Sequence, residues 1–259
     1  MLSTNKGWIR FVPILLNNVN WDTFCNPAAG LSSTNQSQTG KENSVSEPVK
    51  GKAPRRALIV VDIQNDYDGG NLAIQYPPFR DSVVNAARAM DAAAEAGVKV
   101  VVIKQLAPET SPIFAKGSHG AELHPEISRR SRDHYVEKTL PSAFTGTDLD
   151  DWLRANAIDT ITVVGYMTHN CDLSTVIHAV HMGFAVEFLS DATGSVPYAN
   201  SAGYASAEDI HRVVTIILQS RFAAVLRTAE WIDCLKTGTL PERDTIHASN
   251  QRALARNAA

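Results

Sequence analysis

Short apolar runs alternate along the chain with longer stretches in which apolar residues recur every three or four positions. The short runs are typical of strands buried on both faces of a parallel sheet, and the longer pattern is typical of amphipathic helices. Strands are therefore predicted at residues 57–61, 98–104, 133–139, 160–164, 185–189 and 222–226. Helices are predicted at residues 80–96, 148–156, 205–220 and 230–235, with a further helix beginning at Cys171.

This alternation predicts βαβ units, in which parallel strands all end at the same edge of one sheet. We expect an α/β protein with three layers, α/β/α, around a mostly parallel, Rossmann-like sheet. The folded domain is predicted to span residues 54–237. Residues 1–53 contain a long stretch rich in Ser, Thr, Asn, Gln and Gly and are predicted to be a disordered extension. Residues 238–259 are expected to form a polar, frayed C-terminal tail.

Composition narrows the class of protein further. With 259 residues, of which 44% are hydrophobic, the chain can bury one sizeable core. Its 24 basic and 27 acidic residues give a net charge of -3, so a nucleic-acid partner is not expected. Three widely spaced cysteines, Cys25, Cys171 and Cys234, fit a reducing compartment and predict a cytoplasmic protein. The apolar patch at residues 8–16 is too short to span a membrane, and no membrane partner is expected.

Three side chains that could take part in catalysis lie where predicted strands end. Asp62 and Lys138 each lie at the end of a strand, and Cys171 begins the helix that follows another strand. Each has an ordinary alternative explanation: a structural carboxylate, a solvated lysine or a buried small side chain. Parallel strands bring all three to one edge of the sheet, so one shared site is more plausible than three coincidences. A helix N-terminus also favours a thiolate at Cys171.

Three motifs resemble those of the isochorismatase-like cysteine hydrolases, which include nicotinamidases and carbamoylsarcosine amidohydrolase. Residues Val60 to Tyr67 are similar to the D-x-Q-x-D-aromatic opening of that family. Lys138-Thr139 is followed by Ser142-Ala143-Phe144, and Gly165 to Cys171 is similar to G-x-x-T-x-x-C. The motifs occur in the family's order at fitting separations, and the resemblance covers about Arg56 to Leu235.

The resemblance implies a cofactor-independent hydrolase with Asp62, Lys138 and Cys171 as its catalytic triad. It also implies a cis peptide between Tyr166 and Met167, which would direct the N–H groups of Met167 and Cys171 into one oxyanion hole. Lys138 would keep the thiolate pKa low, and Asp62 would accept the thiol proton. The expected reaction cleaves the C–N bond of a small-molecule amide through a thioester. Family members commonly form dimers or tetramers, so a homo-oligomer is expected.

Several departures from the family pattern shape this interpretation. No histidine occurs between Asp62 and Gln105, where nicotinamidases have metal-binding histidines, so no metal is expected. Asp172 replaces the usual apolar residue, and its charge would raise the pKa of the thiolate unless the side chain points to solvent. True isochorismatases hydrolyse an ether and lack the cysteine, so Cys171 disfavours that alternative. A binding protein without chemistry, or a redox-responsive protein using Cys171, remains a further alternative, although a redox sensor would lack an obvious resolving cysteine.

The substrate pocket is the least constrained part of the prediction. Apolar and aromatic residues around the motifs suggest a small, partly apolar amide, whereas ordinary core packing is the alternative for each aromatic side chain. The long connection at residues 105–131 could act as a lid or pocket wall, or could be mobile surface. The candidate substrate-binding residues are Tyr67, Phe79, Leu106, Phe114, Tyr166 and His169.

Overall fold

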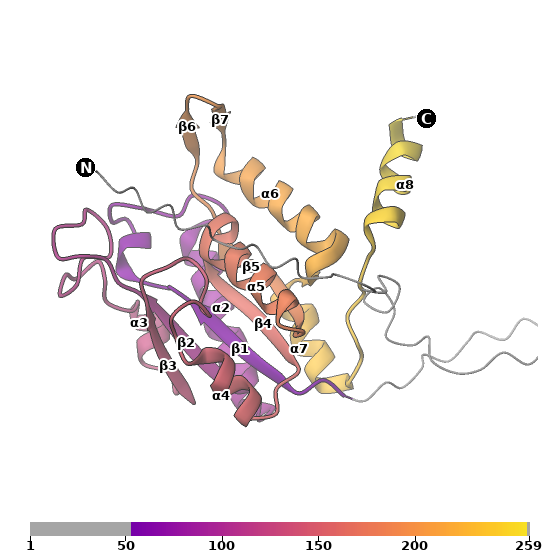
Figure 1. Ribbon diagram of the computed structural model, residues 1–259, viewed down its shortest axis with the longest axis horizontal. Helices are drawn as coiled ribbons and strands as arrows, with labels where there is room; N and C mark the ends of the chain where they lie inside the picture. Colours follow the sequence, from indigo (N-terminus) through magenta and orange to yellow (C-terminus); the bar gives the residue numbers. More distant parts are fainter. Residues whose placement is uncertain (1–52, 258–259) are drawn as a thin grey trace, which may run out of the picture. The chain divides into compact units, whose positions relative to one another are not determined.

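Six parallel strands form the central sheet, in the order β3-β2-β1-β4-β5-β8 (Figure 1). The computed structural model describes residues 53–257, so the predicted extension at residues 1–53 lies outside the described residues except for its last position. Every pair of neighbouring strands in this sheet is parallel, which confirms the predicted α/β class. The strands are β1 (Arg56–Val61), β2 (Lys99–Gln105), β3 (His134–Lys138), β4 (Thr160–Tyr166), β5 (Ala185–Gly194) and β8 (Ala224–Leu226).

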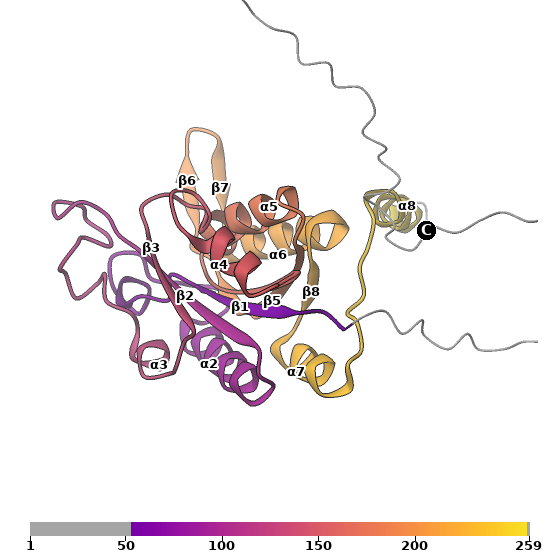
Figure 2. The ribbon, with the colours of Figure 1, turned by 60° about the horizontal axis from the view of Figure 1, so that its bottom comes forward.

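Helices cover both faces of the sheet and complete the three predicted layers (Figure 2). One face carries α2 (Phe79–Glu95), α3 (Pro125–Ser128) and α7 (Thr228–Thr237). The opposite face carries α4 (Leu149–Ala155), α5 (Leu173–His181) and α6 (Ala207–Ile217). Among residues 53–257, every helix is too short or too polar to cross a membrane.

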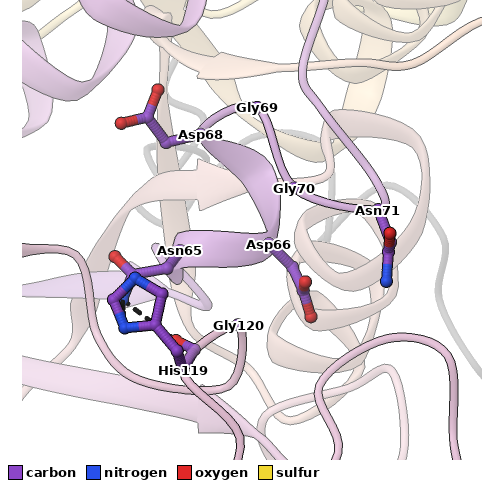
Figure 3. A pocket seen from close by; sticks show the side chains of 8 residues that line it. All are labelled: Asn65, Asp66, Asp68, Gly69, Gly70, Asn71, His119 and Gly120. Atoms are coloured by element: carbon purple, nitrogen blue, oxygen red, sulfur yellow. Dashed lines mark hydrogen bonds between the residues drawn. The ribbon is translucent and has the colours of Figure 1, made fainter.

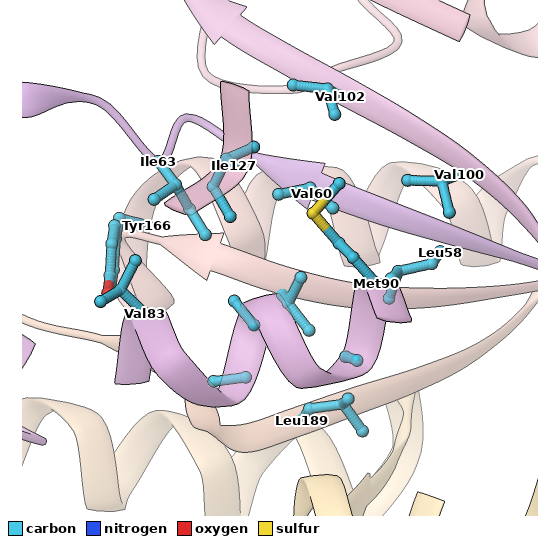
Figure 4. Packing of buried hydrophobic residues seen from close by; sticks show 14 of the residues in the cluster. Leu58, Val60, Ile63, Val83, Met90, Val100, Val102, Ile127, Tyr166 and Leu189 are labelled. Atoms are coloured by element: carbon cyan, nitrogen blue, oxygen red, sulfur yellow. The ribbon is translucent and has the colours of Figure 1, made fainter. Parts of the chain in front are cut away.

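Strand β1 lies at the centre of the core, and alternate side chains face opposite helical layers. Leu58 and Val60 pack in the same apolar cluster as Met90 of α2 (Figure 4). Ile59 belongs to the cluster on the other face, together with Leu153 of α4. All these side chains are almost completely buried, and burying each contributes roughly 1.5–3 kcal/mol to the free energy of folding. The central strands therefore form a rigid base for the loops at their carboxyl ends.

Gly165 allows the carboxyl end of β4 to approach the end of β1. Its φ angle is 122°, and a Cβ atom at this position would lie 2.0 Å from the Val61 carbonyl oxygen. The pairing of β4 with β5 also shifts register between Val163 and Gly165. Only glycine combines this positive φ angle with the absence of a Cβ atom, and it thereby allows the turn after β4 to lie close to the end of β1.

Two elements differ from the prediction. A short antiparallel hairpin, β6 (Tyr198–Asn200) with β7 (Gly203–Ala205), precedes α6 and extends beyond the sheet (Figure 1). The expectation of a frayed C-terminal tail is wrong for α8 (Ile246–Asn257). The hydroxyl of Thr245 accepts a hydrogen bond from the Ala248 N–H at the start of this helix. This cap compensates for the weak apolar pattern on which the prediction relied.

A buried ionic cluster lies in the sheet at the opposite end of β1 from the predicted site. Arg56 Nη2 lies 2.8 Å from Glu187 Oε1, and both side chains are almost fully buried. Glu187 Oε2 accepts hydrogen bonds from Trp231 Nε1 at 2.8 Å and from the Thr162 hydroxyl at 2.8 Å. This network links β1, β4, β5 and α7, and it surrounds the buried Glu187 carboxylate with a cation and two further hydrogen-bond donors.

Candidate active site

The structure brings Asp62, Lys138 and Cys171 together at the carboxyl edge of the sheet. Lys138 Nζ lies 2.7 Å from Asp62 Oδ2 and donates a hydrogen bond to Cys171 Sγ at 3.3 Å. The side chains of Asp62 and Lys138 are completely buried, and Cys171 is 6% exposed. The Lys138 cation thus contacts both a carboxylate and a thiol away from bulk water, where each group strongly affects the protonation of the others.

Burial and the ion pair act in opposite directions on the charged groups. Burial raises the pKa of Asp62 above its usual value, and the neighbouring Lys138 cation opposes only part of that shift. For Lys138, burial lowers the pKa, but the negative charges of Asp62 and Cys171 raise it overall. Lys138 therefore remains a cation, while Asp62 is a stronger base than an ordinary carboxylate.

Burial also raises the pKa of the Cys171 thiol, and the charge of Asp62 raises it further against the opposing effect of Lys138. Lys138 acts in the expected direction, toward a lower pKa, but the expectation of a net lowered pKa at Cys171 is wrong. The dipole and one cation do not offset the loss of hydration and an adjacent carboxylate. Cys171 is therefore a neutral thiol at pH 7, next to the Asp62–Lys138 pair.

Gln105 is a site residue that the sequence analysis did not single out. It ends β2, and its Oε1 accepts a hydrogen bond from Lys138 Nζ at 2.7 Å. Gln64, which is completely buried, holds Gln105 through both main-chain groups, accepting from its N–H at 2.8 Å and donating to its carbonyl at 3.0 Å. The strand-end rule that identified Asp62 and Lys138 applies equally to β2 and could have indicated Gln105.

The turn after β4 begins with a non-proline cis peptide. The Tyr166–Met167 bond is cis, which confirms the cis bond that the resemblance implies. A π-type turn, η2 (Thr168–Asp172), follows directly, and the Asp172 N–H donates to the Met167 carbonyl at 3.2 Å. Cys171 therefore lies in the first turn of a helix, where backbone N–H groups lack preceding carbonyl partners. Whether Met167 and Cys171 form an oxyanion hole stays a prediction.

Four of the predicted substrate-binding aromatics form one packed group beside the site. The Tyr67 ring lies 5.1 Å from both Phe114 and Tyr166, and Phe79 lies 5.6 Å from Tyr166. All four are mostly or completely buried in the core cluster on the α2 face. The Tyr166 hydroxyl lies 2.7 Å from Ser82 Oγ, which ties it to α2.

Within this group, Tyr67 is the residue whose phenol pKa is affected by the charges of Asp62 and Cys171. Burial raises the pKa of its phenol well above the usual value, and the charges of Asp62 and Cys171 raise it further. Leu106 follows β2, is half-buried, and donates its N–H to the Lys138 carbonyl at 2.8 Å. Both residues therefore lie near the triad, although their contact with substrate remains a prediction.

His169 lies in the same turn as Cys171 and is held from two sides. Its Nδ1 lies 3.1 Å from Ser195 Oγ, and its ring packs edge-to-face against Tyr198, with centroids 4.9 Å apart. The buried Nε2 has no hydrogen-bond partner among residues 53–257. Burial lowers the pKa of His169 to about 4, so the ring is neutral at pH 7. Tyr198 was not anticipated, because the β6–β7 hairpin that carries it was not predicted.

Asp172 points into the protein rather than toward solvent. Its side chain is completely buried, and neither carboxyl oxygen has a hydrogen-bond partner within the described part of the chain. Burial raises its pKa well above the usual value, and the negative charge of Asp62 acts in the same direction. The sequence analysis predicts that the charge of Asp172 raises the pKa of Cys171 unless the side chain points to solvent. The structure places the side chain in the interior, where water does not screen this effect.

A surface cavity of about 330 Å³ lies next to η1 (Asn65–Tyr67) and contains none of the triad residues (Figure 3). Asp66 on its wall accepts the Phe114 N–H at 2.6 Å, and a Cβ atom at Gly120 would lie 2.2 Å from Asp66 Oδ1. Asp66 therefore connects two loops. Across residues 53–257, His, Cys, Asp and Glu side chains form no group of three or more suited to a metal ion.

The two described cysteines lie on different faces of the sheet. Cys171 belongs to the core cluster on the α4–α5 face, whereas Cys234 of α7 packs in the cluster on the α2 face. Both are free thiols. Cys234 therefore offers no resolving partner for Cys171, and the redox-sensor alternative gains no support from it; Cys25 lies outside the described residues.

Comparisons with known proteins agree with this fold. The family model named Isochorismatase domain matches residues 56–230. The crystal structure of a candidate isochorismatase from Burkholderia xenovorans LB400 is 65% identical, covers 80% of this chain and 100% of its own, and gives a TM-score of 0.79. A cysteine hydrolase from Pseudomonas syringae pv. phaseolicola 1448A is 29% identical, with 75% and 100% covered and a TM-score of 0.67. Escherichia coli K12 nicotinamidase is 30% identical over 55% of this chain and 84% of its own.

Proposed function

We propose, from the premise that this chain belongs to the isochorismatase family of hydrolases, that it is a cysteine amidohydrolase. Its substrate would be a small amide whose C–N bond is cleaved through a thioester on Cys171. The observation that carries the proposal is the position of Lys138 Nζ, which contacts both Asp62 Oδ2 and Cys171 Sγ. A nucleophile, a base and a cation in mutual contact are the groups that this reaction requires.

The first step moves the thiol proton and forms the carbon–sulfur bond. Asp62 accepts the proton from Cys171 as the sulfur attacks the amide carbon, and the carbonyl π electrons move to oxygen. Because Asp62 has a raised pKa, it accepts this proton more readily than an ordinary carboxylate would. Lys138 stabilises the thiolate as it forms and keeps its hydrogen bond to Gln105, so its position does not depend on Asp62 alone.

The negative charge that develops on the substrate oxygen requires hydrogen-bond donors. In the proposal the N–H groups of Met167 and Cys171 supply them, since both lie in the turn that follows the cis peptide. Fixed main-chain donors need no rearrangement as the charge develops, which makes this kind of stabilisation large.

The second half of the reaction restores the enzyme. Asp62 returns the proton to the substrate nitrogen, the C–N bond breaks, and ammonia or an amine leaves while a thioester remains on Cys171. Water then attacks the thioester carbon and gives one proton to Asp62. The carbon–sulfur bond breaks, the acid product departs, and the proton on Asp62 returns to sulfur.

The residues around the thiol favour an uncharged, compact substrate. The triad is enclosed, with Cys171 only 6% exposed, and the charge of Asp62 is already balanced by Lys138. Neutral His169 offers a buried Nε2, without a partner among residues 53–257, that can form one hydrogen bond with a polar group on the substrate.

Self-association into a dimer or tetramer is a separate proposal that light scattering would test.

The decisive experiment measures ammonia release from a panel of aliphatic, aromatic and carbamoyl amides. Wild type and Cys171→Ala are compared, each with and without a metal chelator. Turnover that disappears in the variant and survives the chelator would support a metal-independent cysteine amidohydrolase, and the best substrate would define the pocket. If no amide is hydrolysed, or if the variant matches wild type, the nucleophile assignment fails and the binding-protein alternative takes its place.

A further inference from the structure

Asp172 is a buried acid that has no role in the proposed reaction steps. It directly follows the nucleophile in η2, its side chain is completely buried, and both carboxyl oxygens lack a hydrogen-bond partner among residues 53–257. No ion pair to Asp172 occurs in that part of the chain. A buried carboxylate without a partner is costly, and proteins retain such groups mainly where they affect function.

The groups whose charge reaches Asp172 belong to the active site or its wall. Asp62 at the end of β1 acts against ionisation of Asp172, and Lys138 at the end of β3 favours it. Asp172 in turn acts on Cys171, on Tyr67 of η1 and on Tyr166 of β4. Lys138 cannot compensate fully, because it already pairs with Asp62 and donates to Gln105 and Cys171.

We propose that Asp172 is a positioning residue that limits the rise of Cys171 reactivity at alkaline pH through its own charge. As a neutral acid it leaves the thiol free to react. Once ionised, it places a second negative charge next to the nucleophile, in addition to Asp62, and the thiolate becomes harder to form. From the pH at which Asp172 releases its proton, reactivity therefore rises less steeply with pH than it would beside a neutral residue.

The size of the effect follows from the adjacency of Asp172 to Cys171 in the chain and from its complete burial. Two like charges close together inside a protein change each other's pKa by about one unit or more. One unit corresponds to about a tenfold change in the fraction of thiolate at a given pH. An amide in place of the carboxyl keeps the shape but cannot ionise, so it isolates the contribution of the charge.

The test measures the rate at which iodoacetamide alkylates Cys171 between pH 5 and pH 10, read by mass spectrometry of the Cys171 peptide. Wild type is compared with Asp172→Asn and with Asp150→Asn, a matched carboxyl-to-amide change in the first turn of α4, away from the site. The rates of wild type and Asp172→Asn should agree at acidic pH and diverge as pH rises. At pH 10 the variant should react about tenfold faster, while Asp150→Asn should follow wild type throughout.

Two results would overturn the inference: profiles that agree within twofold over the whole range, or a constant ratio at every pH, which indicates a purely structural effect. Asp172→Val, which restores the apolar character usual at this position, provides a second variant if the asparagine variant does not fold. Its rate should also rise more steeply at alkaline pH than that of wild type. The inference rests on Cys171 as the proposed nucleophile, but alkylation needs no substrate, so a failure to hydrolyse amides and a failure of this profile are separate results.

Discussion

Lys138 Nζ lies 2.7 Å from Asp62 Oδ2 although strand β2 separates the strands that carry them. The lysine side chain reaches across the end of β2, where Gln105 accepts one of its hydrogen bonds. The same ammonium group also contacts Cys171, which comes from the far side of β1. Lys138 therefore connects Asp62, the proposed base, with Cys171, the proposed nucleophile, and substitutions around it should separate their roles.

Replacing Asp62 by Asn should change two measured rates in opposite directions. Amide hydrolysis should fall by about 10²–10⁴-fold, because the general base is lost. Alkylation of Cys171 at pH 8 should become faster, because the Asp62 charge that raises the pKa of the thiol is removed while Lys138 remains. Both rates are compared with Asp233→Asn, an exposed carboxyl on α7. If both rates fell together, Asp62 would be acting through the fold and not as the base.

Gln105 should affect catalysis by holding Lys138 in place. Gln105→Leu removes the 2.7 Å hydrogen bond to Lys138 Nζ without removing a charge, so kcat should fall about tenfold with little change in KM. Gln75→Leu, at an exposed glutamine outside the site, is the control for kinetic measurements on the best amide. An unchanged kcat would show that Asp62 alone positions the lysine.

His169 is expected to contribute to substrate binding more than to chemistry. His169→Ala removes the buried Nε2 that has no partner among the described residues, so KM should rise about fivefold, the loss expected for one neutral hydrogen bond. His119→Ala, at an exposed loop histidine, should leave KM unchanged. A large loss of kcat at constant KM would instead assign His169 a part in the chemical step.

Much of this site follows from the sequence because strand ends have a recognisable pattern. Asp62, Lys138 and the turn before Cys171 each follow an apolar run, and parallel topology places such ends on one edge. Gln105 shares that position but is chemically unremarkable, so only its contact with Lys138 reveals its role. Tyr198 depends on a three-residue strand that has no apolar periodicity of its own.

Electrostatic environment is the part of the site that sequence could not predict. The helix N-terminus indicated a thiolate at Cys171, but the degree of burial depends on loops distant in sequence, and burial dominates the pKa. The orientation of Asp172 depends on a π-type turn, which shifts each side chain relative to an α-helix. Likewise, α8 is stabilised at its start by Thr245, which an apolar pattern does not register.

The Arg56–Glu187 pair should contribute to stability and not to catalysis. Glu187→Ala leaves the buried Arg56 without its carboxylate and Trp231 Nε1 without its acceptor, so the free energy of unfolding should fall by about 3–5 kcal/mol. Urea unfolding measures the loss, and Glu208→Ala on exposed α6 is the control. Activity per folded molecule should be unchanged, because the pair lies at the opposite end of β1 from Asp62. A drop in kcat at low temperature, where the variant is folded, would contradict this.

Asp172 should also make stability depend on pH in a direction that can be worked out. Its pKa in the folded protein lies well above the ordinary value of 3.8, so between these values the folded state holds a proton that the unfolded state has released. Stability is then fully present below about pH 4 and declines by about 1.4 kcal/mol per pH unit until the folded-state pKa is reached. Asp172→Asn lacks this titration but retains every other group. The difference in free energy of unfolding between variant and wild type, measured by urea at pH 4, 6 and 8, should therefore grow in favour of the variant. A difference that stays constant over that range would mean that Asp172 is already ionised in the folded protein.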